Sequence, residues 1–181
     1  MIRRFAVLLS VLLLGACAAP VRNEDAAYYR VPMHSLITLN QPLTVPEGQT
    51  RVFLQHGKVV AKGKLDQYRS HCDFEVRGVS DGSQVIEPDT FDVTRVSVGD
   101  DFVVSREPVV YAALVIFNDA NQPSQISPYV HHWLSSTKQP QVMRLTCHGG
   151  FDYPGIAEYP SIKQIKQALG AVATLSLATA P

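Results

Sequence analysis

The segment Cys72-Asp73-Phe74-Glu75-Val76-Arg77 decides the fold class of this chain. Apolar and charged residues alternate along it, and a period of two residues is typical of a β-strand that is buried on one face. We expect Cys72, Phe74 and Val76 to point into a core and the three charged side chains to face solvent. A domain built around such strands belongs to the mainly β class.

Further strand signals lie on both sides of this segment. Two β-prone runs flank His56-Gly57, which predicts a hairpin with a two-residue turn. Apolar side chains change parity between residues 91–93 and residues 96–98, which predicts a β-bulge near Thr94 and Arg95. The remaining expected strands are an edge strand broken by Pro42 (residues 36–39 and 43–45), the hairpin arms (50–55 and 58–62), a strand buried on both faces (109–117) and residues 142–147.

The C-terminal region carries the signals of one helix. Ser161 follows a proline and suits the N-cap position, and Gly170 suits the residue just past the helix end. The apolar stripe between them consists of Ile162, Ile165, Ala168 and Leu169. We expect the tail at residues 171–179 to form a strand rather than to prolong the helix. The sum is an antiparallel β-sandwich-like domain over residues 34–181, with seven or eight short strands and one C-terminal helix.

Length and charge narrow the function classes. The chain has 181 residues, which is one domain's worth, and its 16 Lys and Arg balance its 16 Asp and Glu. A nucleic-acid-binding protein normally has a basic face or a high isoelectric point. We therefore expect no nucleic-acid partner.

The first twenty residues have the layout of a secretory signal peptide. Arg3 and Arg4 precede an apolar run at residues 6–14, and small residues follow up to Pro20. The alternative is a transmembrane helix, but the apolar stretch before Pro20 is shorter than the roughly 20 residues needed to cross a bilayer. We therefore expect this segment to direct export.

The end of this segment, Leu14-Gly15-Ala16-Cys17, resembles the lipobox of bacterial lipoproteins at all four positions. The resemblance implies a signal peptide over residues 1–16, fatty acyl chains on Cys17 and a tether over residues 17–33. Ala18 after the cysteine implies sorting to the periplasmic face of the outer membrane. An ordinary cleaved signal that happens to lie near Cys17 is the alternative.

The rest of the chain also resembles uncharacterised proteobacterial envelope lipoproteins. The resemblance lies in RVFLQHGKVV (residues 51–60), HCDFEVRG (residues 71–78) and FDVTRV (residues 91–96). None of these segments has a specific chemistry, so the resemblance implies no activity and no site.

If Cys17 carries lipid, two of the three cysteines, Cys72 and Cys147, remain to pair with each other. Because the periplasm is oxidising, we expect a disulfide between Cys72 and Cys147. The alternative is a metal site that also uses His71 and His148. Neighbours on a strand point to opposite faces, so each cysteine and its adjacent histidine are poorly placed to share an ion.

Motifs that carry chemistry are scarce. The sequence has no glycine-rich phosphate loop, no G-x-S-x-G, no H-E-x-x-H and no C-x-x-C. The polar residues 118–141 are expected to form a loop between two strands, and aromatic residues in an exposed loop often anchor partners. The candidate partner-binding residues are Tyr129, His131, His132 and Trp133 in this segment and Tyr153 in a glycine-rich stretch that also suits a plain connector.

These observations predict a non-catalytic, lipid-anchored periplasmic protein that binds or scaffolds another envelope component. The alternative is a carrier of a small ligand or a metal ion that uses His131 and His132. A hydrolase without a recognisable motif is a third class. We expect no cofactor.

The lipobox generates a direct prediction. Cys17→Ala removes the only thiol that the motif can acylate, so the variant should leave the membrane fraction and appear in soluble periplasmic extract. Fractionation followed by immunoblotting measures this. Unchanged membrane association of the variant would contradict lipidation at Cys17.

Overall fold

The computed structural model describes residues 23–102 and 125–179 of the chain. The expected signal peptide, Cys17 and the expected apolar strand at residues 109–117 lie outside the described residues. Within the described ranges, no helix is long and apolar enough to cross a membrane.

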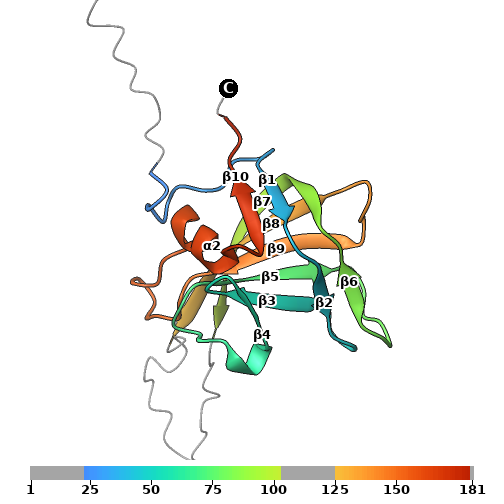
Figure 1. Cartoon of the computed structure of the whole chain (residues 1–181). Coiled ribbons are helices and arrows are strands. Elements are labelled where there is room, and N and C mark those ends of the chain that lie inside the picture. The colour runs from blue at the N-terminus through green and yellow to red at the C-terminus, as the bar shows by residue number, and fades with distance from the viewer. Residues whose placement is uncertain (1–22, 103–124, 180–181) are drawn as a thin grey trace, which may run out of the picture.

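The described residues form a mainly antiparallel β domain with one α-helix near the C-terminus, as the sequence predicts. Eight strands make a curled sheet in the order β10-β1-β7-β8-β9-β5-β3-β4, and β2 pairs with β6 in a separate ribbon (Figure 1). The strands are β1 (Leu36–Leu39), β2 (Leu43–Val45), β3 (Arg51–Gln55), β4 (Lys58–Val60), β5 (His71–Val76), β6 (Gln84–Ile86), β7 (Asp89–Phe102), β8 (Ile126–Ser135), β9 (Val142–His148) and β10 (Ala173–Ser176).

One face of the curled sheet carries the hydrophobic core. The helix α2 (Ile162–Leu169) lies against β5, β3 and β10, and the β2–β6 ribbon contributes further side chains to the same core. The predicted apolar stripe of the helix is buried, and Ser161 and Gln164 form a capping box at its start. The largest fully buried apolar side chains include Phe74, Phe91, Leu54, Leu145, Ile162 and Leu169.

The β3–β4 turn rests on the end of α2. His56 and Gly57 both have positive φ angles of 52° and 72°, as the predicted two-residue turn requires. The Gly57 amide donates to the Ala168 carbonyl at 3.0 Å. A Cβ on Gly170 would lie 2.4 Å from the Gly57 Cα, so this contact admits only glycine at position 170.

The disulfide between Cys72 and Cys147 is present in the middle of the core face. The two residues lie directly opposite each other on β5 and β9, with Cα atoms 4.0 Å apart and no exposed surface. Because side chains alternate, the register places His71 opposite His148 on the other face of the same two strands.

Two expectations about strand environments are wrong. Asp73 is fully buried and Glu75 nearly so, whereas we expected both to face solvent. Of the three charged residues, only Arg77 beyond the strand is exposed. The strand β1 is also not an edge strand, because it lies between β10 and β7.

The bulge and the tail strand agree with the sequence. The register of β7 against β8 shifts between Val93 and Arg95, at the predicted position. The tail forms β10, which pairs with β1 as an outer strand of the sheet.

The described part of the expected tether lies on the domain. Lys166 and Lys163 of α2 form ion pairs with Glu24 at 2.7 Å and with Asp25 at 2.9 Å. The Lys163 amide also donates to the Glu24 carbonyl, and Val31 is buried. Only five residues lie between Cys17 and the first described residue, Asn23, so the two are at most about 20 Å apart along an extended chain.

The disulfide generates a stability prediction. It closes a separation of 75 residues, and on the chain-entropy model its loss lowers the free energy of unfolding by roughly 4 kcal/mol. A Cys72→Ala/Cys147→Ala double variant should show this loss in urea unfolding. Two freely alkylatable thiols in the native exported protein would contradict the bond.

Candidate functional site

The sheet face opposite the disulfide carries a row of aromatic and histidine rings. Alternate residues of β8 place Tyr129, His131 and Trp133 on this face, and the strand register puts His148 of β9 beside Tyr129. His71 of β5 lies next to His148. We call these five residues the ring ladder.

The rings contact one another without a break. Ring centroids are 6.4 Å apart for Trp133 and His131, 4.5 Å for His131 and Tyr129, and 5.6 Å for Tyr129 and His148. The last pair, His148 and His71, is stacked at 4.7 Å with nearly parallel planes. The ladder therefore crosses three neighbouring strands of the sheet.

The Tyr129 side chain packs against Gly99 of β7. A Cβ on Gly99 would come within 2.4 Å of the Tyr129 hydroxyl and 2.5 Å of its Cζ. The two residues are cross-strand partners, so the bare glycine provides the surface on which the ring rests. This packing fixes the middle ring of the ladder.

Two arginines flank the tryptophan end of the ladder. The guanidinium of Arg95 lies 4.2 Å from the Trp133 ring centroid and that of Arg144 lies 5.3 Å from it. Arg144 also donates to Glu75 at 2.6 Å, and the Trp133 indole donates to Ser97 at 3.3 Å. Arg95 is exposed and has no ion pair with any described residue.

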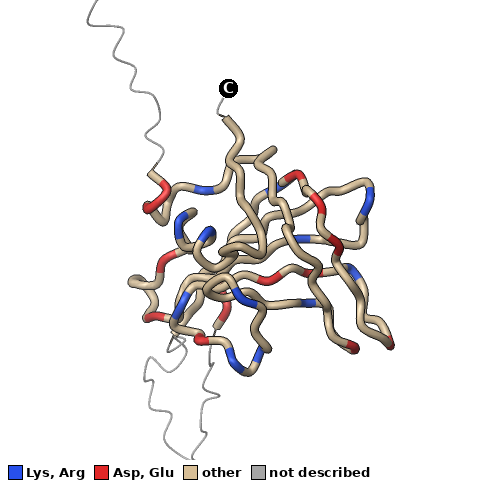
Figure 2. The backbone as a smooth tube through the Cα atoms, viewed as in Figure 1, with Lys and Arg blue, Asp and Glu red and all other residues tan. Residues whose placement is uncertain are grey.

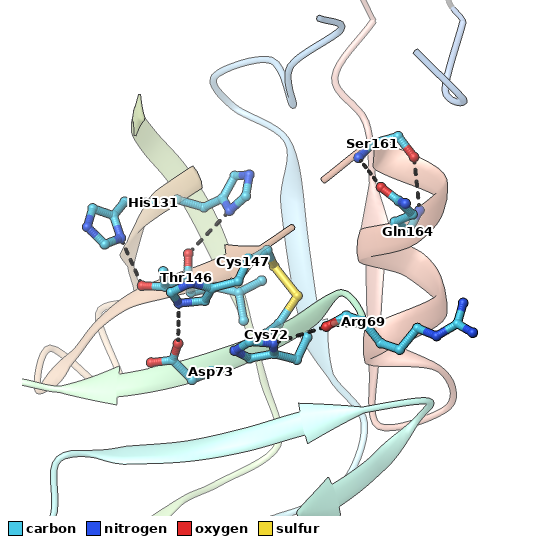
Figure 3. Close-up of a disulfide and its surroundings, with 12 residues drawn as sticks. Arg69, Cys72, Asp73, His131, Thr146, Cys147, Ser161 and Gln164 are labelled. Atoms are coloured by element: carbon cyan, nitrogen blue, oxygen red, sulfur yellow. Dashed lines mark hydrogen bonds and ion pairs between the residues drawn. A yellow bond between two sulfur atoms is a disulfide. The ribbon is translucent and has the colours of Figure 1, made fainter. Parts of the chain in front are cut away.

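Buried charges lie under the histidine end. The Asp73 carboxylate is 3.5 Å from Arg51 Nε and 3.7 Å from His148 Nε2, and Arg51 also reaches Glu75 at 3.3 Å. Neither Asp73 oxygen has a hydrogen-bond partner among the described residues. Figure 3 shows Asp73 and Thr146 together with the disulfide on the same pair of strands.

A small cavity opens at this end of the ladder. It has a volume of about 210 Å³. His71 and His148 line it together with the carboxylate of Asp101 and the side chains of Phe151 and Arg51.

Three histidines of β5 and β8 have pKa values below the ordinary value of the imidazole. Burial and the neighbouring His148 lower the pKa of His71. Burial and the charge of Arg144 lower the pKa of His131 to about 4, and its Nδ1 lies 2.9 Å from the Thr146 hydroxyl. Burial also lowers the pKa of His132 to about 4.

The structure separates the predicted site residues. Tyr129, His131 and Trp133 lie together, but in the strand β8 and not in the expected loop. His132 points to the opposite face, is almost fully buried, and donates from Nδ1 to the Leu145 carbonyl. It is therefore unavailable to a partner. Tyr153 is 61% exposed and makes no ring contact with the other four in the described part of the chain.

A metal site at His131 and His132 is wrong for the same reason, since their side chains leave β8 on opposite faces. No group of three or more His, Cys, Asp or Glu residues in the described ranges is arranged to hold a metal ion. The rival site at the two cysteines is also excluded, because both sulfurs are in the disulfide.

Sequence reasoning missed two members of the ladder as site residues. The sequence pattern indicates His71 and His148 only as possible metal ligands. In the structure they lie directly opposite each other on the paired strands β5 and β9. A signal for β8 was present, because Val130, His132 and Leu134 alternate with the three ladder residues.

Comparisons with protein-family models, curated proteins and solved structures find no match to this chain. Figure 2 shows basic and acidic residues interspersed along the described backbone.

The packing of Tyr129 against Gly99 can be tested with the variant Gly99→Ala. The added methyl should displace the Tyr129 ring, change the ring-current shifts of the His131 and His148 protons, and cost about 1 kcal/mol of stability. Gly82→Ala is the matched control, because a Cβ there meets no atom within 4 Å. Unchanged His131 and His148 signals in the Gly99 variant would contradict this packing.

Proposed function

We propose that this chain is a lipid-anchored, non-catalytic protein of the bacterial envelope that binds another envelope component through the ring ladder. The observation that carries the proposal is the pairing of the half-exposed Trp133 with the exposed Arg95, 4.2 Å away. Tryptophan, tyrosine and arginine are the residues that most often dominate binding energy at protein interfaces.

The contacts around the ladder favour binding over catalysis. Cys147 is held in the disulfide, and the Ser127 hydroxyl donates to the Gly149 carbonyl at 3.0 Å. His131 is engaged with Thr146. A nucleophile needs a base within hydrogen-bond reach, and these side chains are instead committed to structural contacts.

Charge indicates the chemistry of the partner. Arg144 is neutralised by Glu75, whereas Arg95 pairs with no described carboxylate and lies stacked on an aromatic ring. A stacked guanidinium is preorganised for bidentate binding of a carboxylate. We expect the partner to be an envelope protein that places an acidic side chain on Arg95 and an apolar one on the rings beside it.

The anchor supports the same proposal. The described N-terminal residues are fastened to α2 by Lys163 and Lys166, so only the short stretch before Asn23 separates the domain from Cys17. With acyl chains on Cys17, the ladder would stay within reach of other proteins of the same membrane.

In-cell crosslinking and affinity purification from the membrane fraction test this proposal. The native protein should yield one stoichiometric partner. Trp133→Ala and Arg95→Ala should each weaken capture by about thirtyfold, the effect of losing a binding hot spot of about 2 kcal/mol. Tyr28→Ala, which removes an aromatic ring that is 78% exposed outside the ladder, is the matched control.

Two outcomes would contradict the proposal. One is equal capture of the partner by the Trp133 variant and the native protein. The other is loss of the partner in the Tyr28 control. A Tyr153→Ala variant examined in parallel tells whether the separate exposed tyrosine contributes to the same surface.

A further inference from the structure

His148 occupies an unusual position within the ring ladder. One ring nitrogen, Nε2, lies 3.7 Å from the Asp73 carboxylate, and the other, Nδ1, lies 3.7 Å from the Asp101 carboxylate. Its faces and edge contact His71 and Tyr129. The imidazole therefore sits between two carboxylates that come from different strands, β5 and β7.

Both distances lie just beyond hydrogen-bonding range. Asp73 is fully buried, and neither of its oxygens has a hydrogen-bond partner among the described residues. A buried carboxylate without a hydrogen-bond donor is costly, so an added N–H donor near Asp73 would be stabilising. A neutral imidazole carries a single N–H, whereas the imidazolium donates from both nitrogens.

The other charged and titratable groups around His148 come from every neighbouring element. They are His71, Asp73 and Glu75 of β5, Arg51 of β3, Tyr129 and His131 of β8, Asp101 of β7, and Lys62 beside the shared cavity. Arg51 forms ion pairs with both Asp73 and Glu75, so two carboxylates share its single positive charge. The two carboxylates at 3.7 Å are the charged groups in direct contact with the ring.

We propose that His148 is the proton-binding residue of the ring ladder. Its protonation closes an Asp73–His148–Asp101 bridge from β5 to β7 and places a positive charge at the histidine end of the ladder. The stacked His71 stays neutral, because a second proton would put two like charges at a centroid distance of 4.7 Å. His131, engaged with Thr146 and facing Arg144, stays neutral as well.

This inference deepens the proposed function and rests on it in one respect. If the ladder binds an acidic partner, mild acid adds a positive charge just beneath the binding surface and strengthens capture. The proton site itself is a property of the chain alone, so it is measured without the partner.

Histidine resonances followed by NMR from about pH 8 to pH 4 test the proton site. Among His71, His131, His132 and His148, we expect His148 to titrate first. Its two N–H protons should then become protected from exchange with water. Asp101→Asn should weaken proton binding at His148 about threefold, the effect of losing one partly exposed ion pair.

The variants are chosen so that a loss of folding cannot explain a change in the His148 titration. Asp101 is 57% exposed on its side chain, so Asp101→Asn leaves the core untouched. Asp92→Asn is the matched control, because Asp92 faces His34 at 3.4 Å and lies away from the ladder. Earlier titration of His71 or His131, or an unchanged His148 in Asp101→Asn, would overturn the proposal.

Partner capture at about pH 7.5 and pH 5.5 separates the two ideas. If capture is stronger in acid and this gain is lost in His148→Gln, the result supports both the proton site and the proposed function. A first titration at His148 with no partner at either pH leaves the proton site standing and contradicts the proposed function. Stronger capture in acid with His148 titrating last contradicts the proton site alone.

Discussion

The pairing of β5 with β9 is the constraint on which the rest of this structure depends. Its register sets Cys72 opposite Cys147 on one face and His71 opposite His148 on the other. A slip of one residue would exchange the faces of every side chain and leave the cysteines unpaired. The disulfide therefore fixes more than stability, because it also fixes which residues meet on the ladder face.

Charge burial on β5 follows from the same geometry. Both faces of β5 are buried, so Asp73 and Glu75 are buried although they alternate with core residues. Buried carboxylates are tolerated when cations accompany them, and Arg51 and Arg144 supply those cations from the two neighbouring strands. The network is incomplete only at Asp73, whose oxygens lack hydrogen-bond donors among the described residues.

The features that the sequence predicts correctly are those with local causes. The turn at His56-Gly57, the bulge near Arg95 and the capped helix after Ser161 each depend on a few adjacent residues. The environment of Asp73 depends on Arg51 and His148, which distant strands bring beside it, and no local pattern encodes that pairing. The sequence predicts a loop at β8 because the polar residues His131 and His132 obscure the alternation that is typical of a strand.

The candidate site shows the same division. Tyr129 and Trp133 are recognisable from residue type, but their neighbours are set by long-range pairing: Gly99 seats the tyrosine and Arg95 covers the tryptophan. His71 and His148 are each adjacent in sequence to a disulfide cysteine, so the bond holds the two imidazoles stacked. The core face and the ladder face are thus coupled through one strand pair: whatever loosens the β5–β9 register on the cysteine side also separates the stacked rings on the other.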